Sequence, residues 1–586
     1  MISVSGKYWE EEKFNERIIE KIKIEKNFSD LIARQIISKK FNTEEIYSIN
    51  NQLNLTNPFL KNNDFIKGVE LLNDTINSNK RIFIIGDYDV DGCVSTSLIV
   101  KLLESTKSTF FYYIPNRFTD GYGSSLQLVK KIVIKKPDLV IMVDNGSSSN
   151  EAIDYLNKNM IKSIIIDHHE IYSPYPKASI LINPKKRGNY NEYDYFCSGV
   201  LTYFFIDLLL KKRKSKLDFS KNLYLVLLSI ISDVMPLRKI NRNIANIVLS
   251  KIDIDEIYFF KKIFEIKKIQ KPLEIDDLGF LFGPIINSAG RLDDPNIIVD
   301  LLTSKDKTSI NKIIKKLILL NEKRKKIEDL TIKKIDLKKI EKENEPIIII
   351  KDNNIHEGLI GIISSKITNY FNKPSVIITK SENNYKGSAR SINNYPIGKF
   401  IKKALDMKLL ESGGGHNLAA GFTIKKINLE KFKEFLINSC NKKKKISKFT
   451  FLTKISLSAL NKNFIFEYNK LKPYGASNLA PFFYIDEIKF IKTKIIKNRF
   501  ISCLIKNKSG KALPAISFNF LESNLSQNIF NNKNEVGLII QIKEKLWNGR
   551  KDIQVIIIDI IEPSNKAWLM IIYTIKSSHS VPSSIG

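Results

Sequence analysis

The sequence predicts two α/β domains, the larger one with a parallel sheet, joined by a long helix and followed by a C-terminal OB-like β-barrel. With 586 residues, the chain is too long for one hydrophobic core, so several domains are expected. Short apolar runs alternate with amphipathic stretches from about residue 65 to 240, and again after residue 346, as in α/β domains. From about residue 447 the pattern changes to short β runs alone.

These shifts predict the domain boundaries. We expect a helical lead-in over 1–45, a first α/β domain over 46–304 and a connecting helix over 305–343. A second α/β domain follows over 344–444, then the barrel over 445–562 and a tail over 563–586.

The composition narrows the function classes. A net charge of +32 suggests a polyanionic partner such as nucleic acid. The alternative is a genome-wide AT bias, because Lys, Ile and Asn are all abundant and such a bias raises Lys everywhere. The four cysteines form no C-x-x-C pair, which argues against zinc and disulfides and fits a reducing cytosol. No run reaches the ~20 apolar residues that span a bilayer, so we expect a cytoplasmic protein without a membrane contact.

In the first α/β domain, every predicted strand ends in polar residues. The strands are predicted over 82–85, 110–114, 139–143 and 163–166, with helices over 95–103 and 126–133 between them. The residues that follow the strands are Asp87, Asp89 and Asp91, then Pro115-Asn116-Arg117, then Asp144-Asn145-Gly146, then Asp167-His168-His169. Carboxyl ends of parallel strands meet at one sheet edge, where sites collect. One such Asp is usually a turn residue, but four coincidences predict a site.

Three aspartates at alternating positions after a buried strand repel one another and are costly to desolvate. Lys and Arg are absent from the segment 82–92, so a divalent cation is the better compensating charge. Hard oxygen ligands suit Mg²⁺ or Mn²⁺.

Further along the domain, Asp233 follows the apolar run 223–231, which places it in a buried position or at a cleft. The alternative is that Asp233 caps the start of a following helix. Gly283, Pro284 and Gly290 predict a loop over 282–295 that carries Arg291. A Lys-rich helix with an apolar stripe is then predicted from about 305 to 342, its lysines forming a solvated face.

The second α/β domain contains a candidate phosphate site. Strands are predicted over 346–350 and 375–379, and a helix over 360–371. An anion would find three kinds of donor here: the hydroxyl of Ser388, the guanidinium of Arg390 and the backbone N–H groups of a glycine-rich turn over 413–415, which His416 follows. The alternative is a tight turn and a helix start without a ligand.

Six β runs over 449–561 predict the barrel, and the turn 547–550 predicts a hairpin. An OB-type barrel would bind single-stranded nucleic acid through basic and aromatic side chains, although its aromatic residues are equally suited to the core.

The histidines and aspartates of these segments can be read together as one set of metal ligands. Four of the five histidines, at 168, 169, 356 and 416, lie in these Gly- and acid-rich segments. Two divalent cations with one bridging carboxylate fit the set Asp89, Asp91, Asp144, His168 and Asp233. Such a pair activates water and stabilises the attacking and leaving oxygens at phosphorus, which points to hydrolysis of a phosphodiester or phosphoanhydride.

These segments resemble the successive motifs of the DHH phosphoesterase superfamily. The matching segments are Asp87-Tyr-Asp-Val-Asp-Gly92, Asn116-Arg-Phe-Thr-Asp-Gly-Tyr-Gly123, Val143-Asp-Asn-Gly146 and Asp167-His-His169. Gly414-Gly-His-Asn-Leu-Ala-Ala-Gly421 resembles the signature of the DHHA1 domain. With Ser232-Asp-Val-Met-Pro-Leu237 and Asn287-Ser-Ala-Gly-Arg291, residues 30 to 560 are similar to the superfamily's bacterial single-strand-specific DNA exonucleases. The chain departs from that pattern at Ile285, Ile355 and Ala389, none of them a predicted metal ligand.

The resemblance implies roles for the site residues. Asp89, Asp91, Asp144, His168 and Asp233 would be the ligands of two Mg²⁺ or Mn²⁺ ions. His169 would assist at the scissile phosphate, with Asp87 an outer or weaker ligand. Substrate phosphates, including the 5′ end, would be held by Arg117, Arg291, Ser388 and Arg390, with Gly415 and His416 close by.

The resemblance also implies 5′→3′ hydrolysis of single-stranded DNA to 5′-mononucleotides in DNA recombination and repair. A single-strand-binding protein and a helicase would be partners, and the protein would be a monomer. Two alternatives stay open: a phosphodiesterase of the same chemistry that acts on short RNA oligonucleotides or cyclic dinucleotides, and a nucleic-acid-binding protein without catalysis.

Overall fold

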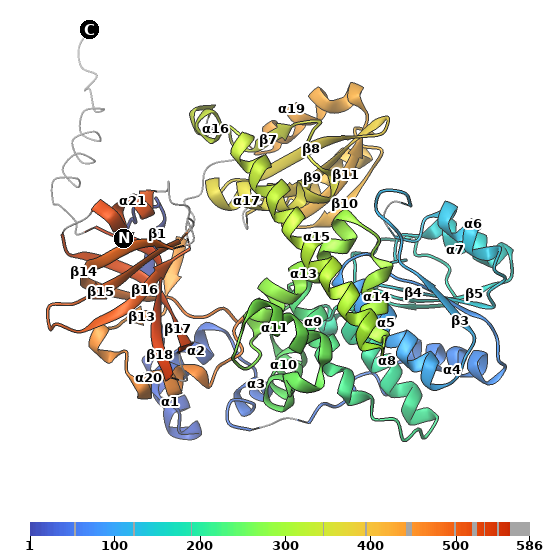
Figure 1. The fold of residues 1–586 in the computed structure, drawn as a ribbon, viewed down its shortest axis with the longest axis horizontal. Coiled ribbons are helices and arrows are strands. Elements are labelled where there is room, and N and C mark those ends of the chain that lie inside the picture. The colour runs from blue at the N-terminus through green and yellow to red at the C-terminus, as the bar shows by residue number, and fades with distance from the viewer. Residues whose placement is uncertain are drawn as a thin grey trace, which may run out of the picture. The chain divides into compact units, whose positions relative to one another are not determined.

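The computed structural model describes residues 1–51, 54–120, 123–188, 190–343, 345–392, 395–440, 448–496, 500–518, 524–531, 534–547 and 550–562. The chain folds into two compact units (Figure 1). One unit consists of residues 54–443, and the other joins residues 1–53 to residues 444–586. The predicted tail over 563–586 and the residues 548 and 549 of the predicted hairpin turn lie outside the described residues.

A five-stranded parallel sheet organises the first half of unit 54–443. Its order is β3-β2-β4-β5-β6, and every neighbouring pair is parallel. The strands are β2 (Ile82–Ile85), β3 (Phe110–Tyr113), β4 (Leu139–Val143), β5 (Lys162–Ile166) and β6 (Ile180–Ile182). The predicted parallel sheet is therefore confirmed, and β6 is a strand that the sequence pattern did not reveal.

Alternate residues of these strands face two separate cores. Ile82, Ile84 and Ile141 pack on the large core that includes α5 (Val90–Ser105), α8 (Ser198–Lys212) and α9 (Leu223–Ser232). Phe83 and Val140 pack on the opposite core, beneath α6 (Leu126–Val133) and α7 (Asn150–Lys158). Helices on both faces explain why the strands are continuously apolar rather than alternating.

The predicted loop over 282–295 is wrong for most of its length. A π-helical turn (Leu278–Phe282) leads into α13 (Gly283–Leu292), with Pro284 in its first turn, where proline is tolerated. Close packing explains the glycines that suggested a loop. A Cβ on Gly290 would lie 2.1 Å from the Tyr88 carbonyl oxygen, and one on Gly283 would lie 3.0 Å from Ser232 Oγ.

The predicted connecting helix is two helices. The first helix is α15 (Lys307–Lys334), which ends at Ile335, where the backbone is extended. The second helix, α16 (Leu337–Glu343), begins after Asp336, whose side chain accepts a hydrogen bond from Lys339 N. The apolar stripe of α15 packs on the large core as expected, with Ile310, Ile314 and Leu317 buried.

A second sheet, of order β10-β11-β9-β8-β7, forms the rest of this unit. It contains β7 (Ile348–Lys351), β8 (Ser375–Ser381), β9 (Asn384–Arg390), β10 (Ser412–His416) and β11 (Ala419–Ile424), covered by α17 (Ile360–Phe371), α18 (Ile397–Asp406) and α19 (Leu429–Cys440). Only β7 and β8 are parallel. The predicted glycine-rich turn is instead the edge strand β10, which pairs with β11 because Gly415, at φ 147°, allows a backbone that side chains rarely adopt.

The other unit holds a closed five-stranded barrel, which confirms the predicted OB-like fold. Its strands β14, β15, β16, β18 and β17 are neighbours in that order, and a β14–β17 pairing closes the ring. Their bounds are β14 (Phe483–Ile496), β15 (Phe500–Lys506), β16 (Ala512–Ser517), β17 (Val536–Trp547) and β18 (Arg550–Ile561), beside α20 (Lys462–Asn469) and α21 (Asn524–Asn531). Trp547 pairs with Arg550, so the flanking strands form the predicted hairpin.

The N-terminal residues 1–53 belong to this barrel unit, and Figure 1 shows the labels β1, α1 and α2 beside the barrel strands. The predicted helical lead-in contains the helices α1 (Glu16–Lys26), α2 (Asp30–Ser38) and α3 (Thr43–Tyr47), and the strand β1 (Tyr8–Glu11), which the sequence pattern did not reveal, precedes them. The strand β1 pairs in parallel with β12 (Lys448–Phe451). In the sequence, the two-residue strand β13 (Thr453–Lys454) follows β12. Trp9 is 1% exposed and donates from Nε1 to Asp559 Oδ2 at 3.1 Å, which anchors the segment.

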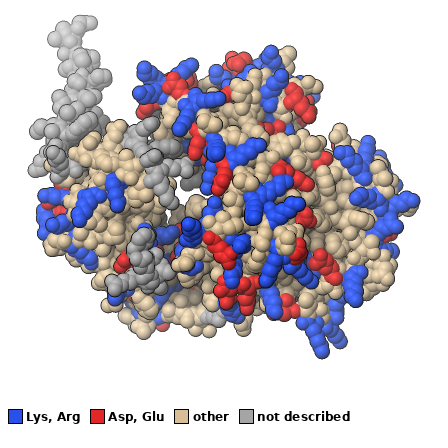
Figure 2. Space-filling view, viewed as in Figure 1, with Lys and Arg blue, Asp and Glu red and all other residues tan. Residues whose placement is uncertain are grey.

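Lys and Arg are interspersed with Asp and Glu over the face in Figure 2, so the net charge alone does not mark a nucleic-acid path there. Among the described residues, no helix is both long enough and apolar enough to cross a membrane.

Candidate functional site

The end of β2 and the start of α5 position the first three carboxylates. Asp87 Oδ1 accepts a hydrogen bond from Tyr88 N at 2.7 Å. Asp89 caps α5, accepting from Gly92 N at 3.1 Å, and Asp91 lies in the first helical turn. A Cβ on Gly92 would lie 2.4 Å from Asp87 N, so only glycine permits this tight strand-to-helix turn.

The ends of β4 and β5 bring four more groups to the same sheet edge. Asp144 follows β4 with φ 62°, a left-handed conformation that is uncommon outside glycine and often marks functional positions. Beyond β5, Asp167 Oδ1 accepts from His168 N at 2.8 Å and contacts His169 Nδ1 at 2.8 Å. Asp167 therefore holds the ring of His169 and the backbone of His168.

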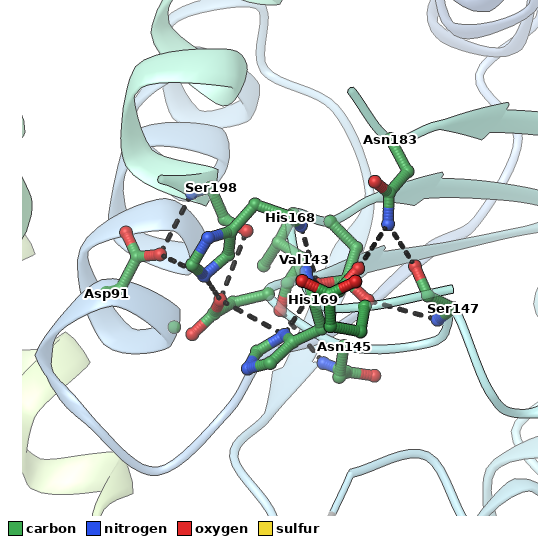
Figure 3. Close-up of polar contacts among 12 residues, drawn as sticks. Asp91, Val143, Asn145, Ser147, His168, His169, Asn183 and Ser198 are labelled. Atoms are coloured by element: carbon green, nitrogen blue, oxygen red, sulfur yellow. Dashed lines mark hydrogen bonds and ion pairs between the residues drawn. The ribbon is translucent and has the colours of Figure 1, made fainter. Parts of the chain in front are cut away.

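His168 is the point where the carboxylates converge. Its Nε2 lies 3.3 Å from Asp144 Oδ1 and 3.5 Å from Asp233 Oδ2. It also lies 3.6 Å from Asp91 Oδ2, and Figure 3 shows His168 beside Asp91. Asp233 reaches this position from the C-cap of α9, so the alternative that it starts a helix is wrong. The structure thus brings together the five predicted metal ligands, which come from four separate stretches of the chain.

The potential ligands form overlapping triplets whose ligand atoms lie within 4.8 Å of one another. The triplets are Asp91, His168 and Asp233; Asp87, Asp89 and Asp144; and Asp144, His168 and His169. Asp144 is shared between groups, as a bridging carboxylate would be. Asp87 and Asp89 belong to the same triplet, so membership of a triplet does not separate these two residues.

Burial and mutual repulsion raise the pKa of most of these carboxyls. Burial and the charge of Asp89 raise the pKa of Asp87 to about 7. Burial and the charge of Asp91 raise the pKa values of Asp89, Asp144 and Asp233 above the ordinary range. Ionisation of these carboxyls in the folded protein is therefore costly unless a cation compensates their charge.

The surroundings shift the pKa values of His168 and His169 in opposite directions. Burial and the nearby His169 lower the pKa of His168 to about 3, which leaves a neutral imidazole able to bind a metal. Burial also opposes the charge on His169, but the Asp167 carboxylate outweighs it and raises the pKa of His169 to about 10.

The donor set fits divalent cations. It offers carboxylate oxygens and one neutral imidazole, which suit Mg²⁺ and Mn²⁺. In the described part of the chain, no Lys or Arg lies within ion-pair distance of Asp87, Asp89, Asp91, Asp144 or Asp233. A cation is the compensation that the repelling carboxylates lack.

A second cluster, which we call the arginine cluster, consists of Arg291, Ser388 and Arg390 at the start of α17. Arg390 Nη1 donates to Ser388 Oγ at 3.0 Å, and Arg291 Nη1 donates to the Gly358 carbonyl at 3.2 Å. A Cβ on Gly361 would lie 3.0 Å from Arg390 Nη2, so glycine lets the guanidinium approach the helix terminus. Burial and the charge of Arg117 lower the pKa of Arg291 to about 10, as expected for cations gathered without an anion.

Arg117 and His416 lie at the edges of the two clusters. Arg117 stacks on the Tyr88 ring, 4.1 Å from its centroid, and its Nε is buried without a hydrogen-bond partner among the described residues. His416 stacks with His169 at a centroid distance of 6.2 Å, and its Nδ1 lies 3.6 Å from Glu170 Oε1. Gly415 precedes it on the exposed edge strand.

Sequence reasoning missed several polar residues that support the site. Asn183 Nδ2 donates to Ser147 Oγ at 2.8 Å and to the His169 carbonyl at 2.9 Å (Figure 3). Asn183 follows β6, so the apolar run 180–182 was the available signal. Ser198 and Ser229 contact Asp91 and Asp144 from two helices, and nothing in the local sequence marks them.

Family models cover three regions of the chain. Residues 81–230 match the DHH family, N-terminal domain; residues 344–442 match the DHHA1 domain; and residues 453–559 match the RecJ OB domain.

Individual relatives agree with these matches. The chain is 30% identical over 397 residues to the single-stranded-DNA-specific exonuclease RecJ of Dickeya dadantii, covering 63% of this chain and 68% of the relative. It is 24% identical over 565 residues to the RecJ of Bacillus subtilis, covering 94% and 70%. The crystal structure of RecJ in complex with Mn²⁺ from Thermus thermophilus superposes with a TM-score of 0.79 at 20% identity, covering 95% of this chain and 80% of that one. The chain belongs to the RecJ family of the DHH superfamily.

Proposed function

We propose that the protein is a metal-dependent exonuclease that degrades single-stranded DNA from the 5′ end to 5′-mononucleotides, in DNA recombination and repair. One observation carries the proposal: His168 Nε2 lies 3.3–3.6 Å from carboxylates of Asp91, Asp144 and Asp233. The family relatives named as single-stranded-DNA-specific exonucleases give the substrate class.

In this proposal Asp89, Asp91, Asp144, His168 and Asp233 hold two Mg²⁺ or Mn²⁺ ions, with Asp87 beside them. Such ions activate a water and stabilise the oxygens exchanged at phosphorus. His169, held charged by Asp167, supplies a positive hydrogen-bond donor to the scissile phosphate. His416 stacks on His169, and we assign it and the preceding Gly415 to the substrate-binding residues beside the metal ligands.

The arginine cluster is the proposed grip for the 5′ phosphate. Guanidinium groups bind phosphate oxygens in a bidentate way, and helix N-termini favour anions. Ser388 and Arg390 lie together near the start of α17, and Arg291 is tied to Gly358 just before it. Arg117 offers an unpartnered buried Nε for a further phosphate.

The barrel supports a polymeric substrate over a small one. An OB-type barrel binds single strands by stacking and charge, and a cyclic dinucleotide needs no such surface. The predicted association with a single-strand-binding protein and a helicase, and the monomeric state, stay predictions that co-purification and light scattering would test.

The test uses DNA strands that carry a 5′ label, with Mn²⁺ or Mg²⁺ present. The proposal predicts labelled mononucleotide as the first product from linear single strands, and no product from blunt duplex or closed single-stranded circles. Cleavage of circles, or first release of nucleotides from the 3′ end, would refute it. Preferential hydrolysis of cyclic dinucleotides or short RNA would favour the alternative phosphodiesterase.

A further inference from the structure

Asp91 lies against the N-terminus of α8 and is held there by two backbone groups. Ser198 N donates to Asp91 Oδ2 at 2.9 Å, and Gly199 N donates to Asp91 Oδ1 at 2.8 Å. The helix has no capping side chain of its own, because Cys197 makes no such hydrogen bond. The Asp91 carboxylate therefore occupies the position of a helix cap while one edge faces His168.

A second helix holds the same carboxylate. Ser229, in α9, donates from Oγ to Asp91 Oδ1, and its Oγ lies 3.0 Å from Cys197 Sγ. The packing is tight, since a Cβ on Gly199 would lie 2.4 Å from Ser229 Oγ and 3.1 Å from Asp91 Oδ1. Asp91 consequently has little freedom to rotate.

Ser198 also contacts the neighbouring carboxylate. Its Oγ donates to Asp144 Oδ1 at 3.1 Å while its backbone N holds Asp91 (Figure 3). One residue thus links a carboxylate from the start of α5 with a carboxylate from the end of β4. Both Ser198 and Ser229 are fully buried, so water does not compete for these hydrogen bonds.

We propose that Ser198 and Ser229 are positioning residues of the cation site, whose hydroxyls hold Asp91 and Asp144 in the orientation that binds divalent cations. This rests on the proposed function. Two buried carboxylates that repel each other turn apart unless donors hold them, and neutral hydroxyls do so without competing as cations. Groups that orient metal ligands in this way are typically worth about 10–100-fold in metal affinity.

Binding of Mn²⁺ to the full-length, metal-free protein tests the proposal without substrate. Ser198→Ala keeps the backbone N–H on Asp91 and removes only the hydrogen bond to Asp144, and Ser229→Ala removes the hydroxyl on Asp91. Ser97→Ala is the matched control, because Ser97 is also fully buried on α5 but bonds the Cys93 carbonyl instead. Calorimetry and the electron paramagnetic resonance signal of free Mn²⁺ give the dissociation constants.

The expected result is a rise of about 10–100-fold in the Mn²⁺ dissociation constant for both site variants and little change for the control. In nuclease assays, saturating Mn²⁺ should restore most of the turnover, which a purely structural defect would not allow. Unchanged Mn²⁺ affinity in folded Ser198→Ala would overturn the proposal, and if that variant does not fold, Ser229→Ala decides in the same way. Wild-type protein that binds no Mn²⁺ would refute the proposed cation site itself and this inference with it.

Discussion

Replacing Asp87 with asparagine should stabilise the metal-free protein, and the gain should depend on pH. Asp87 is 2% exposed, and burial together with the charge of Asp89 raises its pKa from 3.8 to about 7. A carboxyl with a raised folded pKa costs no stability while it is neutral in both states, and opposes folding once the unfolded chain ionises. At 1.36 kcal/mol per pKa unit, the penalty approaches about 4 kcal/mol above pH 7 and disappears below about pH 4.

Asparagine should remove most of this penalty and little else. It has the size of aspartate, and its Oδ1 can still accept the hydrogen bond from Tyr88 N. The figure of about 4 kcal/mol is an upper limit, because neighbouring groups adjust their own protonation when one charge disappears.

Thermal and urea unfolding of the full-length protein in EDTA measure the effect at pH 8 and pH 5. Asp87→Asn should be more stable than wild type at pH 8, with less than half of that gain at pH 5. Adding Mn²⁺ should narrow the difference, because cations neutralise the wild-type carboxylates. Asp154→Asn, at an exposed position of α7, is the control and should show no such pH dependence. An Asp87→Asn protein that is no more stable than wild type at pH 8 would refute the reasoning.

Three further predictions concern catalysis, substrate grip and packing. Asp144→Ala should lower turnover by about 10³-fold, as expected when a group that stabilises developing charge is lost. Gel shifts should show nearly unchanged DNA binding by this variant. Substantial residual turnover would contradict the role of Asp144. Arg390→Ala should raise KM for 5′-phosphorylated strands by about 10–100-fold and leave 5′-hydroxyl strands nearly unchanged; equal losses on both would argue against a 5′-phosphate contact. Gly290→Ala should cost about 1–3 kcal/mol in unfolding free energy, because its Cβ would lie 2.1 Å from the Tyr88 carbonyl oxygen, whereas Gly414→Ala has open space and should be neutral. Equal stabilities of these two variants would show that α13 shifts freely.

The sequence predicted the elements whose pattern is local. The strands 82–85 and 139–143 and the helices 126–133 and 360–371 have the predicted bounds, since their apolar periodicity is complete within each segment. Polar residues after successive strands also predicted the site, because parallel strands share one carboxyl edge.

Elements fixed by distant contacts were not predictable in this way. The glycines and proline of α13 look like loop residues, and only the close approach of Gly290 to Tyr88 explains the helix. The strand Tyr8–Glu11 depends on β12, whose residues Lys448–Phe451 are far from it in the sequence. Ser198 and Ser229 lie in apolar helices, and their role becomes visible only when the fold brings them to Asp91.

The most direct test of the proposed chemistry is a crystal structure of Asp87→Asn with Mn²⁺ and a 5′-phosphorylated single-stranded oligonucleotide. We predict two anomalous-scattering peaks within bonding distance of the set Asp89, Asp91, Asp144, His168 and Asp233, and the 5′ phosphate on Arg291, Ser388 and Arg390. The absence of Mn²⁺ at His168, or a strand bound with its 3′ end in the arginine cluster, would contradict the proposed site and its polarity.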